Sequence, residues 1–359
     1  MRGAFASTAA GAAAAGPGDP RAALVSAAEA ELAHGHAVAA FEGFEQAGAM
    51  RHDADSEMGL VRAAMQLGHY RRALAFCAHV AGEHLDAPGA SVLYAWLLRV
   101  GGRRELAERA LREALERAPG DPIVAAAVAA LASPLLTVPL ALLRPPHRVA
   151  PFSIGVVGDV APSAEARVVS SGVLLPGGRH VLVPGGSRPS RLWVRDGLGA
   201  TREAVPETDD ATEGAVTLWR LTTAIDDPDA MLIRRPVSGT PAFGVEYAET
   251  STAIPAWPWM RAGFLGAATP DRTALRLGTD MAAAHAGGPV LDRAGCLVGI
   301  ALRDAAGRAT VRPLPPRASQ TGDARAGAQA SASGPSVDLA FDQLYERAMR
   351  VAVQVIAVP

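Results

Sequence analysis

One stretch of the chain has the residue types of a catalytic turn but not the reactive group. Residues 284–289 read Ala-His-Ala-Gly-Gly-Pro, followed by an apolar run, a tight turn at 292–295 and a second apolar run. Covalent attack on a carbonyl needs a hydroxyl or a thiol, and residues 282–291 contain no Ser, Thr or Cys. The stretch predicts a backbone frame without a nucleophile.

This stretch resembles the nucleophile turn of trypsin-like serine peptidases, in which Gly-Asp-Ser-Gly-Gly-Pro precedes an apolar strand. On that resemblance Ala286 stands at the serine position, and Ala284 and His285 replace the Gly and Asp before it. In such a triad the serine attacks the carbonyl, a histidine takes its proton and an aspartate orients the histidine. The methyl group of Ala286 can do none of this.

Two further stretches carry the same resemblance. Residues 172–183 resemble the second and third strands of the family, and Gly186 stands where the catalytic histidine follows them. Residues 215–221 resemble the strand that begins with the aspartate, and Ala215 stands at that position. The resemblance therefore implies a trypsin-like double antiparallel β-barrel that has lost all three catalytic groups, which makes it a pseudopeptidase. His180 and His285 offer a relocated base, but we interpret them as strand-edge and turn residues.

The strands that must hold these positions are short Val, Leu and Ile runs separated by Gly, Pro and Asp, the pattern of an antiparallel barrel or sandwich. We expect strands at 153–158, 168–175, 180–183, 192–195, 215–221, 242–246, 274–277, 297–302 and 309–312. Because substrate pairs with the strand equivalent to 297–302 in the peptidases, we also hypothesise that this strand accepts an extended segment.

The residues before the barrel show a repeat. Gly35, Gly68 and Gly102 are 33 and 34 residues apart, and Ala40, Ala73 and Ala107 follow at the same steps. A shared period of this length predicts stacked helical hairpins, and it resembles the 34-residue tetratricopeptide repeat. The Gly is expected at the turn of each hairpin and the Ala where its two helices approach closest.

Such a stack either serves as a rigid spacer or dimerisation element, or holds a partner's segment in its concave groove. On the repeat register the groove residues are Glu29, Arg62, Met65, Gln66, Trp96 and Arg99. We predict a partner-binding site at Arg62, Met65, Gln66, Trp96 and Arg99, because Trp and Arg are frequent interface anchors.

The composition limits the kinds of partner that are expected. The 359 residues include 34 basic residues, all Arg, and carry a net charge of -2 without a basic stripe, so nucleic acid is not an expected partner. No apolar run reaches membrane-spanning length, so we expect a water-soluble protein without membrane insertion.

The Ala- and Gly-rich start is a poor secretory signal, which favours the cytoplasm. Cys77 and Cys296 are expected to be buried free thiols, and the dispersed histidines predict no metal site and no cofactor.

The predicted order is a multidomain chain, α followed by all-β. It comprises a disordered leader (1–20), a tetratricopeptide helical domain (21–133), a Pro-rich linker (134–149), a trypsin-like barrel domain (150–314), a flexible linker (315–336) and a C-terminal helix (337–359, with the amphipathic part at 338–353). We interpret the chain as a non-catalytic adaptor or subunit of a larger complex that binds a protein or peptide. The alternatives are an active or atypical peptidase and a chaperone-like peptide binder.

Overall fold

The computed structural model describes residues 19–132, 162–185, 189, 191–207, 215–225, 231–247, 256–279, 286–314 and 337–358. The expected strand at 153–158, the linkers at 134–149 and 315–336, and almost all of the expected leader lie outside these residues. None of the described helices combines the length and the apolar character needed to span a bilayer.

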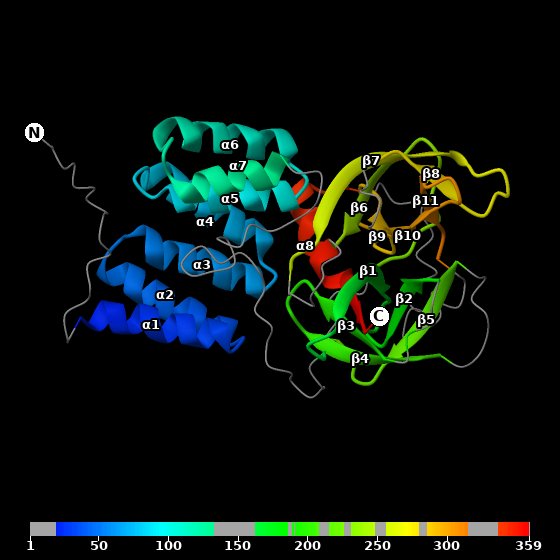
Figure 1. The fold of residues 1–359 in the computed structure, drawn as a ribbon, viewed down its shortest axis with the longest axis horizontal. Coiled ribbons are helices and arrows are strands. Elements are labelled where there is room, and N and C mark those ends of the chain that lie inside the picture. Colours follow the sequence, from blue (N-terminus) through cyan, green and yellow to red (C-terminus); the bar gives the residue numbers. More distant parts are fainter. Residues whose placement is uncertain are drawn as a thin grey trace, which may run out of the picture.

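Helical hairpins stacked side by side form the first half of the chain (Figure 1). Within the described residues they are α1 (Pro20–Ala33), α2 (Ala37–Met50), α3 (Ala54–Gln66), α4 (Tyr70–Glu83), α5 (Pro88–Val100), α6 (Arg104–Arg117) and α7 (Pro122–Ala132). The three repeated glycines lie at the α1–α2, α3–α4 and α5–α6 turns with φ of 84°, 75° and 83°, a conformation that glycine adopts at little cost. Ala40, Ala73 and Ala107 are fully buried in the second helix of each hairpin. The predicted tetratricopeptide-type repeat is confirmed.

Two closed six-stranded barrels form the second half. Their strands are β1 (Arg167–Leu174), β2 (His180–Pro184), β3 (Leu192–Asp196), β4 (Thr201–Pro206), β5 (Val216–Leu221), β6 (Pro241–Glu246), β7 (Trp259–Ala268), β8 (Leu275–Leu277), β9 (Pro289–Leu291), β10 (Leu297–Arg303), β11 (Ala309–Arg312) and β12 (Ala352–Ala357). All pairs within the barrels are antiparallel; the first barrel has the order β1-β12-β3-β4-β5-β2 and the second β10-β11-β8-β7-β6-β9. This is the trypsin-like double barrel that the resemblance implied.

The C-terminal segment departs from the expectation of one helix over 338–353. Helix α8 (Phe341–Val351) ends earlier, and β12 begins at the next residue. The β-branched residues Val353, Val355 and Ile356 favour a strand, and β12 pairs with β1 on one side and β3 on the other. The end of the chain thus supplies the sixth strand of the first barrel.

Helix α8 lies between the helical stack and the barrels (Figure 1). The ring of Tyr345 packs 4.5 Å from that of Tyr70 in α4, and its hydroxyl donates to the Pro258 carbonyl 2.6 Å away, just before β7. At the exposed edge, Arg71 pairs with Asp342 at 3.2 Å. Because Tyr345 is fully buried, α8 joins the two halves through a packed contact.

Candidate functional site

The turn that resembles the nucleophile turn lies where the two barrels meet. The Ala286 carbonyl accepts a hydrogen bond from the Ser171 N–H of β1 at 3.0 Å. A Cβ on Gly287, whose φ is 97°, would lie 2.2 Å from the Ser171 carbonyl oxygen, and one on Gly288 would lie 1.7 Å from the Val245 carbonyl oxygen of β6. Close backbone approach from both barrels therefore requires the Gly-Gly pair, with or without a nucleophile.

Of the other two predicted triad positions, the structure describes Ala215. The Gly185 N–H at the end of β2 donates to the Ala215 carbonyl, just before β5, at 2.8 Å. A Cβ on Gly287 would also lie 2.4 Å from the ring of Pro184. The backbone thus joins Gly185 to Ala215 and brings Pro184 close to the turn at Gly287, while Gly186, the predicted histidine position, and His285 lie outside the described residues.

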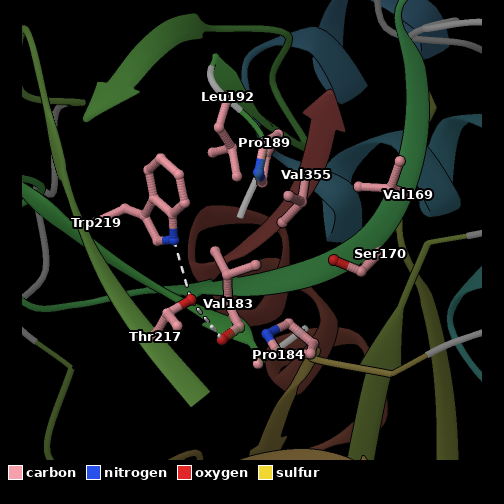
Figure 2. A pocket seen from close by; sticks show the side chains of 10 residues that line it. Val169, Ser170, Val183, Pro184, Pro189, Leu192, Thr217, Trp219 and Val355 are labelled. Atoms are coloured by element: carbon pink, nitrogen blue, oxygen red, sulfur yellow. Dashed lines mark hydrogen bonds between the residues drawn. The ribbon is translucent and has the colours of Figure 1, made fainter. Parts of the chain in front are cut away.

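A pocket of about 200 Å³ opens beside Pro184 and Gly185 in the first barrel (Figure 2). Its described lining combines apolar side chains with polar groups, among them two hydroxyls: Val169, Ser170, Val183, Pro184, Gly185, Pro189, Leu192, Thr217, Trp219 and Val355. Figure 2 shows the Trp219 indole N–H donating to the Thr217 hydroxyl at 3.0 Å, and that hydroxyl reaching the Val183 carbonyl at 3.4 Å. Within this lining no carboxylate, imidazole or thiol is available as a base or nucleophile.

The histidine that follows the predicted second strand does not replace the missing base. His180 opens β2 at the end away from Pro184, where it pairs across the sheet with Arg220 and lies 3.7 Å from Glu207. Burial lowers the pKa of His180, although the Glu207 carboxylate acts in the opposite direction. Its place and its carboxylate partner agree with the strand-edge interpretation.

The strand proposed to accept an extended segment is already paired along both edges. β10 bonds to β9 over residues 297–300 and to β11 over residues 300–303. The Leu297 N–H donates to Leu232 at 2.9 Å, and the Leu297 carbonyl accepts from Arg234 at the same distance. That hypothesis was wrong for this conformation, because the chain itself satisfies these backbone groups.

The five predicted groove residues are all buried, and they divide into two sets. Arg62 is held inside the stack: its guanidinium forms a two-point ion pair with Glu29, one contact at 2.9 Å, and also donates to the Met58 carbonyl at 3.2 Å. Met65 is fully buried on the same helix.

The second set faces the barrels. The Trp96 ring meets the Trp259 ring of β7 edge-on at 5.0 Å, and the Arg99 guanidinium lies 5.2 Å from the centre of the same Trp259 ring. The Gln66 side-chain amide donates to the Leu198 carbonyl in the turn after β3. In this conformation the barrels therefore occupy this end of the groove.

Asp196 shapes the turn that receives Gln66. Its carboxylate accepts hydrogen bonds from the Leu198 N–H at 3.0 Å and the Ala200 N–H at 2.8 Å. Burial raises the pKa of Asp196 to about 6 despite these stabilising contacts. The contact between the stack and the first barrel thus rests on a buried acid.

No family model matches the chain, and no curated protein matches it. Among solved structures, the chain is similar to the type III secretion chaperone SycD of Yersinia enterocolitica in complex with a YopD peptide, at 22% identity and a TM-score of 0.29, covering 32% of this chain and 94% of that one. It is also similar to the MamO protease domain of Magnetospirillum magneticum, at 18% identity and a TM-score of 0.33, covering 45% and 89%. A third, the first tetratricopeptide domain of Spaghetti bound to an HSP90 peptide, has 12% identity and a TM-score of 0.28, covering 31% and 89%. The fold itself rests on the helix hairpins and the strand order described above.

Proposed function

We propose that this protein is a non-catalytic interaction adaptor, in which a tetratricopeptide-type stack and a pseudopeptidase double barrel act as binding surfaces within a larger complex. The observation that carries the proposal is the described pocket beside Gly185, whose lining side chains include no base next to the Ser170 and Thr217 hydroxyls. Ala215 and Ala286, at two of the predicted triad positions, have only methyl side chains. We also propose the domain limits drawn from the sequence, 21–133 for the helical unit and 150–314 for the barrel unit.

Catalytic silence follows from the chemistry of the remaining groups. The hydroxyls of Ser170 and Thr217 are the candidates for attack in the described pocket lining, and an unassisted hydroxyl at neutral pH is a weak nucleophile. A base elsewhere cannot help, since general-base catalysis needs contact with the proton that is removed or one bridging water. We expect no hydrolysis of casein or of peptide esters above the buffer rate.

The partner site in this proposal is the groove at Arg62, Met65, Gln66, Trp96 and Arg99. Trp259 covers Trp96 and Arg99 in the conformation described here, so a partner segment that uses them must displace Trp259. The indole N–H of Trp96 is buried without a hydrogen-bond partner among the described residues, and a displacing segment with a carbonyl or carboxylate would satisfy it.

Affinity purification of the full-length protein from its native host, followed by mass spectrometry, identifies the partner. Binding is then measured for the wild type, Trp96→Ala and Trp259→Ala. We expect Trp96→Ala to weaken binding about thirtyfold, or roughly 2 kcal/mol, and Trp259→Ala to strengthen it because the groove is uncovered. Unchanged affinity in both variants, with a lowered melting temperature, would restrict Trp96 to holding the barrel and refute the groove site.

A further inference from the structure

Four titratable side chains far apart in the sequence meet at one end of the second helical hairpin. His52 precedes α3, Glu57 lies in its first turn, His79 lies in the last turns of α4, and His84 is the residue at which α4 ends. The two helices run antiparallel, so the start of α3 and the end of α4 are adjacent. These histidines are dispersed in the sequence and predicted no metal site, whereas the fold brings the three together with a carboxylate.

The ligand atoms of three of these residues are spaced as they would be around a single ion. His52 Nε2 lies 2.7 Å from Glu57 Oε1, His79 Nε2 lies 3.8 Å from the same oxygen, and the two nitrogens are 3.3 Å apart. Ligands held roughly 2.0–2.2 Å from a tetrahedral zinc ion are separated from one another by about 3.3 Å. All three atoms lie within 4.8 Å of one another, so one ion can contact them together after small side-chain rotations.

The fourth residue lies against the other side of the carboxylate. His84 Nε2 is 3.3 Å from Glu57 Oε2, yet the two atoms are not aligned as a hydrogen bond, and both are buried without a hydrogen-bond partner among the described residues. A buried polar atom without a partner costs free energy, and the cost is larger for a charged group. The cluster therefore contains a carboxylate whose second oxygen lacks a donor, next to imidazoles that open to solvent.

We propose that His52, Glu57 and His79 bind a Zn²⁺ ion, with His84 as a positioning residue that holds the Glu57 carboxylate. Imidazole nitrogen with one carboxylate oxygen is a donor set for zinc and its transition-metal neighbours, whereas Ca²⁺ and Mg²⁺ prefer sites made of oxygen. The side chains of His52 and His79 are 58% and 50% exposed, so an ion can enter from solvent while Glu57 stays 12% exposed beneath it.

The neighbouring charges do not compete for the ion. Asp53, which follows His52 directly, accepts from the Ser56 N–H at 3.0 Å as the cap of α3 and pairs with Arg21 and Arg51. The ion would tie the loop before α3 to the last turns of α4, which closes the open end of this hairpin. Its place is far along the chain from the pocket in the first barrel, and this inference does not depend on the proposed function.

The competing explanation is a network of histidines paired with Glu57 without any ion. The two explanations differ in binding stoichiometry and in spectroscopy, so both are measured on full-length protein that has first been treated with a chelator and dialysed. Zn²⁺ is titrated by isothermal calorimetry in the presence of a competing chelator, and Co²⁺ is titrated by visible absorption. A matched control is His34→Ala/His36→Ala, which removes two exposed histidines of the first hairpin that lie beside Glu31.

We expect one Zn²⁺ per chain, unaffected by excess Mg²⁺ or Ca²⁺, and visible Co²⁺ bands of a low-symmetry site that Zn²⁺ abolishes. His52→Ala/His79→Ala removes only half-exposed side chains, so it should fold, keep its far-ultraviolet circular dichroism and lose the site. His84→Ala should weaken Zn²⁺ binding by roughly 10–100-fold, as loss of a contact that supports a ligand does. The control pair should bind as the wild type does. Zn²⁺ binding that is absent from the wild type, or equal in His52→Ala/His79→Ala, would overturn the proposal.

Discussion

The contact between the barrels around Ala286 is defined by its backbone, whereas the histidine cluster is defined by its side chains. At the contact between the barrels, main-chain hydrogen bonds join Gly185 to Ala215 and Ser171 to Ala286, and the side chains of Gly185, Ala215 and Ala286 are only hydrogen or methyl groups. The cluster has no special backbone, yet it holds three imidazoles around one carboxylate.

The contrast has a physical cause. Gly287 and Gly288 are required by the close approach of two barrels, so this part of the turn serves packing whether or not a serine stands beside it. His52 and His79 are half exposed and contribute little to packing, so in the proposed zinc site their role is to bind the ion. Stability is therefore expected to depend on the contact between the barrels, and ligand binding on the cluster.

The largest effect is expected from Gly287→Ala. The methyl group would meet the Ser171 carbonyl and the Pro184 ring at a residue with φ of 97°, so we predict a loss of about 4 kcal/mol or more in the free energy of unfolding. Urea denaturation measures this loss in the free energy of unfolding. Gly120→Ala is the matched control, since its Cβ would meet nothing within 4 Å, and it should change stability by no more than about 0.5 kcal/mol. Equal effects of the two substitutions would show that the turn is not fixed by packing.

Trp96→Ala removes a buried ring at the contact between the stack and the barrel. We predict a smaller loss, about 3 kcal/mol, in the free energy of unfolding. A double-mutant cycle with Trp259→Ala should give a coupling energy of about 1 kcal/mol, as for other aromatic pairs. Additive losses would mean that the two rings do not stabilise each other and that the stack is held elsewhere.

The pH dependence of stability tests the buried acid in the same contact. Because burial raises the pKa of Asp196 to about 6, from 3.8, the native state keeps a proton that the unfolded chain has lost between these values. Stability should therefore fall by about 2–3 kcal/mol as the pH rises from about 4 to about 6, and remain lower above it.

Asp196→Asn keeps an acceptor for the Leu198 and Ala200 N–H groups and removes the charge, so it should abolish this fall. The difference between the two proteins cancels the contribution of His180, whose lowered pKa makes stability decline as the pH falls toward acid. Asp271, whose pKa hydrogen bonds from Thr269 and Thr273 lower to about 2, acts below this window. Parallel pH profiles would show that Asp196 is not the titrating group.

The predictability of the fold depended on how local its determinants are. The repeat was found from Gly35, Gly68 and Gly102 because a hairpin turn is set by residues a few positions apart. Strand β12 was missed because the helical pattern of 341–351 continues into it, and its partners β1 and β3 lie more than 150 residues away. Strand β7 was missed because its Gly and Ala residues weaken the alternation that marks a strand.

How much of the candidate sites could be predicted also depended on whether their determinants are local in the sequence. The triad positions Gly186, Ala215 and Ala286 were predicted because each stands in a recognisable local sequence pattern, and this assignment stays a prediction. The cover that Trp259 forms over Trp96 depends on how the barrel packs on the stack, which no spacing in the sequence encodes. His52, His79 and His84 meet only after α3 and α4 pair, and one cue was available: His79 and His84 close the helix whose hairpin partner begins after His52.

Labelling with a fluorophosphonate probe tests the central claim most directly, because such probes react with activated serines. Full-length wild-type protein and Ala286→Ser are compared with an active trypsin-like peptidase under the same conditions. We expect no labelling of either, since Gly186 and Ala215 leave the introduced serine without a base or an orienting acid. Labelling of the wild type that Ser170→Ala abolishes, or labelling gained by Ala286→Ser, would contradict it.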